Sequence, residues 1–177
     1  FKEDHFQLDI GINQTELRIL DLSKNNIVFL LHPSSDKLSK LTWLSLAHNR
    51  ISLFPADLVK GLKDLQHLNL EGNTIERIKD FDFANSPRLR ELNLAHNQIS
   101  EISEKAMQNS TQLQRLDLSY NDLTRLPSDV FVGLSRLWLD MSHNNLREFS
   151  EDIFHRTKIQ ELQSSFCKLV LNSISTA

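Results

Sequence analysis

A period of 24 residues runs through this chain of 177 residues. Leucine opens each of six successive segments, at Leu17, Leu41, Leu65, Leu89, Leu113 and Leu137. The first five segments read LxxLxLxxNx(L/I) without a mismatch, as in LRILDLSKNNI and LTWLSLAHNRI. A chain with such a period folds as stacked copies of one small unit, because a single unit cannot bury its apolar side alone.

The leucine spacing inside each repeat predicts a short β-strand. The last two leucines of LxxLxL alternate with polar residues, which is the period of a strand with one buried face. Stacked repeats then form a parallel sheet with strands about 4.8 Å apart. Apolar residues later in each repeat fill the opposite side of the core, namely Ile75, Ile78 and Phe83; Ile99, Ile102 and Met107; and Leu123, Leu126 and Phe131.

An asparagine stands where the chain leaves each predicted strand, at Asn25, Asn49, Asn73, Asn97, Asn121 and Asn144. Backbone groups buried at such a bend need hydrogen-bond partners. An amide side chain both donates and accepts, so stacked asparagines tie neighbouring turns together. We therefore expect a structural asparagine ladder with no catalytic role.

These repeats resemble the leucine-rich repeat family over residues 1 to about 171. The resemblance implies an α/β repeat solenoid, a curved horseshoe with a parallel concave sheet and loops or short helical turns on the convex side. Residues 1–16 are then the back half of a preceding repeat, 17–158 hold six repeats, and 159–177 begin a truncated seventh. The sixth repeat lacks a residue between Leu137 and Leu139, and Cys167 takes the asparagine position in the seventh as an inert structural thiol.

The residue before the second strand leucine points out of the sheet on the concave face. Large aromatic residues and arginine on an exposed surface are typical interface anchors, although scattered surface aromatics are also ordinary. We predict a protein-binding surface that consists of Trp43, His67, Arg90, Glu91, Arg115, Tyr120 and Trp138.

The sequence offers little for metal binding or catalysis. His48, His96 and His143 share one column, but His48 and His96 lie two strands apart, about 10 Å, and zinc bonds are about 2 Å. Asp117 and Asp140 would be neighbours, which allows a weak cation site or a raised carboxyl pKa as an alternative to a solvated stripe. No hydrolase triad, HExxH or phosphate loop occurs, so we expect no enzyme, cofactor or metal.

The net charge, the hydropathy and two glycosylation motifs indicate where in or outside the cell this protein is located. The net charge of −3 leaves no electrostatic footprint for nucleic acid. No apolar run reaches the roughly 18–20 residues of a membrane span, so a membrane link needs an anchor outside this segment. Two N-x-(S/T) acceptors, Asn13 and Asn109, share one repeat position with Gly61, Asn85 and Gly133, where we expect a left-handed turn. They favour an extracellular or cell-surface glycoprotein.

The resemblance implies a non-enzymatic protein-binding module. The uninterrupted repeats look most like chaoptin-type adhesion proteins, which implies a membrane-anchored parent with homophilic contact. Toll-type receptor ectodomains are the first alternative and imply a separate ligand and dimerisation. A cytosolic regulatory scaffold remains the second, because a single cysteine suits that compartment.

Overall fold

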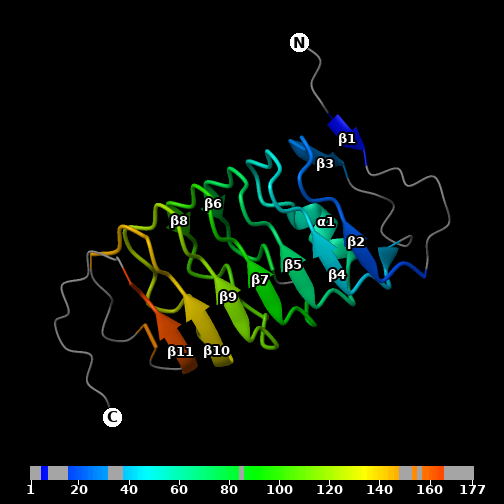
Figure 1. Ribbon diagram of the computed structural model, residues 1–177. Coiled ribbons are helices and arrows are strands. Elements are labelled where there is room, and N and C mark those ends of the chain that lie inside the picture. The colour runs from blue at the N-terminus through cyan, green and yellow to red at the C-terminus, as the bar shows by residue number, and fades with distance from the viewer. Residues whose placement is uncertain are drawn as a thin grey trace.

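A single row of parallel strands dominates the computed structural model, which describes residues 5–7, 16–31, 38–83, 86–147, 153–154 and 157–165. The seven-stranded sheet has the order β11-β10-β9-β7-β5-β4-β2 (Figure 1). Its members are β2 (Ile19–Asp21), β4 (Trp43–Ser45), β5 (His67–Asn69), β7 (Glu91–Asn93), β9 (Arg115–Asp117), β10 (Ser135–Asp140) and β11 (Lys158–Gln163). Each strand pairs with the strand of the next repeat, which confirms the predicted solenoid.

The strand register aligns equivalent residues of successive repeats. Trp43 pairs with His67, His67 with Glu91, and Glu91 with Arg115. Arg115 in turn pairs with Trp138. The outward side chains therefore form one continuous row across the sheet, about 4.8 Å apart from strand to strand.

The strand leucines form the inner wall of the core. Leu44, Leu68, Leu92, Leu116 and Leu139 are all buried, none more than 2% exposed. The far wall contains Phe83, Met107 and Phe131, which are also buried. Burying a Phe or Leu side chain contributes about 1.5–3 kcal/mol, so this two-sided core holds the stack together.

Two aromatic contacts extend the far wall. Phe54 meets Phe83 edge-on with ring centroids 4.5 Å apart, and Phe131 stacks on Phe154 at 6.1 Å. The repeat pattern predicts no role for Phe54, because Phe54 falls in the second repeat, where Val59 takes the usual Phe position.

In the described part of the chain, the convex side carries one helix and two short strand pairs. Helix α1 (Ala56–Gly61) buries Leu58 and Val59. Strands β6 (Arg77–Ile78) and β8 (Glu101–Ile102) pair in parallel, as do β1 (His5–Gln7) and β3 (Phe29–Leu31). The strand pairs add to the loops and helical turns that the resemblance implies.

The predicted left-handed turn holds at two positions and is wrong at a third. Asn109 and Gly133 have φ of 71° and 86°. Gly61 does not have a positive φ, because it is the last residue of α1, and the chain leaves that helix through Leu62 at φ −98°. Asn13 and Asn85 lie outside the described residues.

The short sixth repeat is accommodated at the start of its strand. The pairing of β10 with β11 is irregular between Ser135 and Trp138, and Arg136 has φ 59°. Leu137 and Leu139 are both fully buried. The missing residue is thus absorbed by a local irregularity, and the core positions are kept. The final repeat's Cys167 lies outside the described residues.

No helix in the described part of the chain is long and apolar enough to cross a membrane.

Candidate protein-binding face

The asparagine side chains join each turn to the preceding repeat. The Asn49 Nδ2 donates to the carbonyl oxygens of Leu22 and Leu46, each at 2.9 Å, and its Oδ1 accepts from the Ile27 N–H at 3.0 Å. The same bonds recur at Asn73, Asn97, Asn121 and Asn144. Asn25 donates only within its own turn among the described residues. This ladder fixes the spacing of the strands beneath the outward row.

A second column of polar side chains shapes the same turns. The Asp117 Oδ1 accepts from the backbone N–H of Ser119 at 3.0 Å and from its hydroxyl at 2.7 Å. Asp140 accepts from the Ser142 N–H at 2.8 Å. Asp21, Asn69 and Asn93 make the corresponding bond two residues on. Such a bond closes an Asx turn, a role that the sequence analysis missed although the Asp, Asn and Ser column was visible.

Hydrogen bonds in these turns also affect the pKa of a carboxylate. Hydrogen bonds from the side chain and backbone of Ser23 hold the pKa of Asp21 below its ordinary value. Within the described residues, no group of three or more His, Cys, Asp or Glu side chains could hold a metal ion.

Stacked aromatic rings occupy the turns that follow some of the strands. The residue before each ladder asparagine has a positive φ, at Lys24, His48, Gly72, His96, Tyr120 and His143. Tyr120 is stacked between His96 and His143, with centroid distances of 4.2 and 4.0 Å. Tyr120 therefore lies in the turn after β9, beside the strand row rather than on it.

Two side-chain pairs occupy the centre of the concave face, the outward side of the seven-stranded sheet. The Arg115 guanidinium carbon lies 3.6 Å from the centroid of the Trp138 ring, a cation–π contact. The His67 Nδ1 lies 3.1 Å from the Glu91 Oε2. Both pairs join neighbouring strands, so these long side chains are held in place before any partner arrives.

The structure brings together most of the residues predicted to bind a partner. Trp43, His67, Glu91, Arg115 and Trp138 form one row across five strands. Arg90 is exposed directly before that row, and Tyr120 stands in the adjacent turn. Trp43 is half-buried beside Ile19, which is 65% exposed. Their role in binding stays a prediction.

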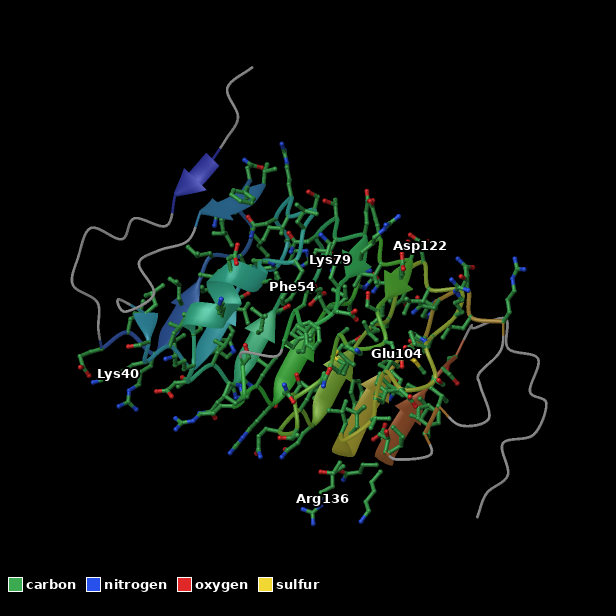
Figure 2. The ribbon with its side chains drawn as sticks, turned by 180° about the vertical axis from the view of Figure 1, so that it is seen from behind. Lys40, Phe54, Lys79, Glu104, Asp122 and Arg136 are labelled. Carbon is green, nitrogen blue, oxygen red and sulfur yellow. The ribbon has the colours of Figure 1, made fainter. Side chains whose placement is uncertain are left out.

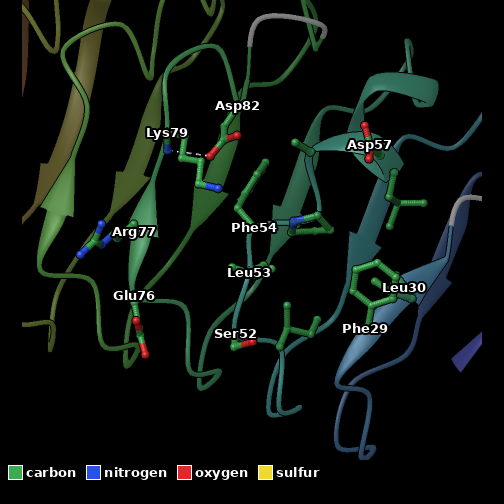
Figure 3. A pocket seen from close by; sticks show the side chains of 14 residues that line it. Phe29, Leu30, Ser52, Leu53, Phe54, Asp57, Glu76, Arg77, Lys79 and Asp82 are labelled. Carbon is green, nitrogen blue, oxygen red and sulfur yellow. Dashed lines mark hydrogen bonds between the residues drawn. The ribbon is translucent and has the colours of Figure 1, made fainter. Parts of the chain in front are cut away.

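An apolar hollow of the described region lies away from this row. A cavity of about 530 Å³ opens between β3, α1 and β6 (Figure 3). Leu30, Leu53 and Phe54 line it, and the backbone N–H of Lys79 donates to the Asp82 carboxylate at 2.8 Å. Burial raises the pKa of Asp82. Charged side chains of both signs, namely Asp57, Glu76, Arg77 and Lys79, also line this hollow, which lies outside the row of large side chains on the sheet.

The fold and this face define a repeat solenoid that presents an extended concave surface, the architecture with which repeat proteins bind other proteins. Comparison with known families gives the same result: the leucine rich repeat family matches residues 15–75, 68–123, 87–146 and 111–169. The chain belongs to the leucine-rich repeat family, whose repeats are generally protein-interaction modules.

A comparison with curated proteins finds a partial relative. The chain is 33% identical to Toll-like receptor 3 of Boselaphus tragocamelus over 82 residues. The match covers 41% of this chain and 9% of that receptor. The matched region is therefore a small part of that receptor's length.

Proposed function

We propose that this chain is the protein-binding segment of a cell-surface adhesion protein of the chaoptin type. The observation that carries the binding proposal is the row from Trp43 to Trp138, in which large side chains stand on one rigid sheet face. Trp and Arg are enriched among the residues that dominate binding energy. A partner that covers this row buries aromatic surface with little loss of side-chain freedom.

Packing and hydrogen bonds hold the backbone beneath this row of large side chains. The buried strand leucines and the asparagine ladder hold the backbone beneath every member of the row. The Arg115–Trp138 and His67–Glu91 contacts restrict the side chains themselves. Preorganisation of this kind lowers the entropic cost of association.

A second candidate is the ligand-binding segment of a Toll-type receptor. The 33% identity with Toll-like receptor 3 favours it, although that match spans 82 residues. Adhesion and receptor functions both place the parent protein at a membrane and both use this surface. The two functions differ in the partner: an adhesion protein binds the same protein on a second cell, whereas a receptor binds a separate ligand.

The acceptor Asn109 supports a cell-surface location. Its side chain is exposed in a turn at φ 71°, and Thr111 of the same motif is exposed as well. A glycan there would leave the core and the concave face free. Mass spectrometry of the native parent protein should find Asn109 occupied, and an unmodified Asn109 would favour the cytosolic scaffold.

Cell clustering tests the adhesion proposal directly. The full-length parent protein is displayed on non-adherent cells, which are mixed with parental cells carrying none. We expect clusters of expressing cells only, and Trp43→Ala should reduce them while its surface level and thermal unfolding stay near wild type. Leu53→Ala is the matched control, because Leu53 is 62% exposed on the convex side.

Two outcomes oppose the proposal in different ways. An absence of clusters with wild-type protein favours the receptor for a separate ligand. A large loss of stability in Trp43→Ala would instead mean that Trp43 belongs to the core, and the assignment of the face would be wrong.

A further inference from the structure

Charge is unevenly distributed over the sheet. We count as the concave face the row from Ile19 to Glu161, the outward strand residue two positions after each member, and the next outward residue at the turn. Its described charged residues are Asp21, Glu71, Glu91, Arg115, Asp117, Asp140 and Glu161. Six carboxylates thus face one guanidinium. Arg115 is stacked on Trp138, and Glu91 contacts His67, so the single cation does not neutralise the surface.

The turns that precede the strands, together with the first residues of β10 and β11, have the opposite sign. We call this border the basic edge, and its exposed cations among the described residues are Arg18, Lys40, Lys63, Arg88, Arg90, Arg136 and Lys158. Figure 2 shows Lys40 and Arg136 projecting from the same margin of the sheet. Among the described residues, the carboxylates along this border are Glu16, which contacts Lys40 at 2.5 Å, and Asp64, which contacts Arg88 at 2.6 Å.

Several cations of the basic edge stay without an ion pair in the described chain, namely Lys63, Arg90, Arg136 and Lys158. In the existing pair, the hydrogen bond and charge of Lys40 lower the pKa of Glu16. The repeats place like charges along the edge at the strand spacing, and a surface of opposite sign would relieve their repulsion.

One cation–π contact already exists on the concave face. Arg115 lies flat on Trp138 at 3.6 Å. Trp43, at the other end of the row, is half-buried and has no cation over its ring among the described residues. An arginine supplied by a partner can stack on Trp43 as Arg115 stacks on Trp138. Asp21 of β2 and Glu71 in the turn after β5 are the nearby counter-charges.

We propose that the concave face binds the basic edge of a second copy of this chain. The inference rests on the proposed function, in that it assumes a protein-binding concave face, and it adds the identity of the bound surface. Complementary charge between two different surfaces of one molecule favours a heterologous contact between copies. Asn109 lies in a turn of this border that carries no charge in residues 109–114, so a glycan there would interrupt none of the basic side chains.

Sedimentation velocity of the chain at two ionic strengths provides the first test. Self-association should be strong near 0.01 M, where the Debye length is about 30 Å, and nearly lost near 1 M, where it is about 3 Å. A chain that stays monomeric at low salt overturns the proposal, and so does an association that salt does not weaken.

A charge exchange then tests the two surfaces. The edge variant is Lys63→Glu with Arg90→Glu, and the face variant is Glu91→Lys with Glu161→Lys. Each variant alone should associate at least tenfold more weakly than wild type, because its two charge reversals bring one of the two contacting surfaces close to neutral. An equimolar mixture should recover association, because the unaltered basic edge of the face variant meets the unaltered acidic face of the edge variant.

The matched control is Lys105→Glu with Arg125→Glu, which has the same charge change as the edge variant but lies on the convex side. We expect wild-type association from it, and thermal unfolding of every variant close to wild type. Equal weakening by the control, or no recovery in the mixture, overturns the proposal. If Trp43→Ala still reduces cell clustering in that case, the proposed function stands with another partner surface; if it does not, both fail.

Discussion

The imidazole of His48 lies over Gly72, so close that a Cβ on Gly72 would be 2.4 Å from the His48 Nδ1. Gly72 has φ +66°, but its column also contains His48, His96 and Tyr120 at similar angles. A left-handed backbone therefore admits side chains in this column. Glycine is needed at Gly72 because the ring of the preceding repeat occupies the space above it.

Replacing Gly72 with alanine should destabilise the fold. The left-handed conformation costs an alanine about 1–2 kcal/mol, and the close approach to His48 adds to this unless the ring moves. We expect a loss of about 1–3 kcal/mol in urea unfolding. In the double variant Gly72→Ala with His48→Ala the steric part should disappear, so it should be less destabilised than the sum of the two single variants. Strict additivity would show that the His48 ring moves aside freely.

The asparagine ladder gives a second prediction. Asn97 is 8% exposed, accepts from the Ile75 N–H and donates to the Leu70 and Leu94 carbonyls. Asn97→Leu leaves these backbone groups without partners, which should cost about 1–3 kcal/mol. Calorimetry should show a lower melting temperature. Gln98→Leu, at the exposed next position, is the control and should change it little; equal melting temperatures for Asn97→Leu and wild type would contradict the ladder's role.

The strands and the residue pairs between adjacent strands could be predicted from the sequence. Leucine alternation determines which strand face is buried, and a fixed period brings Trp43 beside His67 and Arg115 beside Trp138 without further information. The ladder asparagines followed from the need to satisfy buried backbone groups at the turn. These features depend on nearest-neighbour repeats alone, so a repeating pattern predicts them.

Features that depend on irregular spacing could not be predicted. The end of α1 at Gly61 depends on a helix that the other repeats do not share. The stack of Tyr120 between two histidines depends on side-chain direction in a left-handed turn. The charge contrast between the basic edge and the concave face appears only when residues of many repeats are gathered on their surfaces.

The raised pKa of Asp82 predicts a specific pH dependence. Burial makes the folded protein hold this proton more tightly than the unfolded chain does, against the opposing hydrogen bond from Lys79. The ionised carboxylate therefore destabilises the fold at neutral pH, and this penalty disappears as the pH falls below the unfolded pKa. The Asp82→Asn variant keeps an oxygen that can accept from Lys79 and removes the charge.

We expect Asp82→Asn to be more stable than wild type at neutral pH by less than about 1 kcal/mol, because solvent screens a half-exposed carboxylate. Urea unfolding from acidic to neutral pH should show the difference shrinking as the pH falls. Asp129→Asn, at an exposed convex position, is the control. An Asp82→Asn variant that is less stable than wild type at neutral pH, with a deficit that disappears at acidic pH, would mean that the hydrogen bond from Lys79, rather than burial, dominates.

Ser110 and Thr157 stand at equivalent positions of two repeats, but substitutions of their hydroxyls should change the free energy of unfolding in opposite directions. Ser110 is 1% exposed and its Oγ has no hydrogen-bond partner. At the equivalent position of a later repeat, the Thr157 hydroxyl donates to the Phe131 carbonyl at 2.6 Å. Burying an unpaired hydroxyl is unfavourable, whereas a made hydrogen bond is worth about 1 kcal/mol.

Ser110→Ala should therefore raise the free energy of unfolding by about 1 kcal/mol, because it removes an unsatisfied polar atom and keeps the backbone bonds of residue 110. Thr157→Val should lower it by a similar amount, because the shape is kept and the bond to Phe131 is lost. Ser86→Ala, where a second buried hydroxyl lacks a partner, should repeat the gain. If Ser110→Ala and Ser86→Ala are both destabilising, their hydroxyls have partners, such as bound water, in solution. If Thr157→Val is neutral, the Phe131 carbonyl finds another donor.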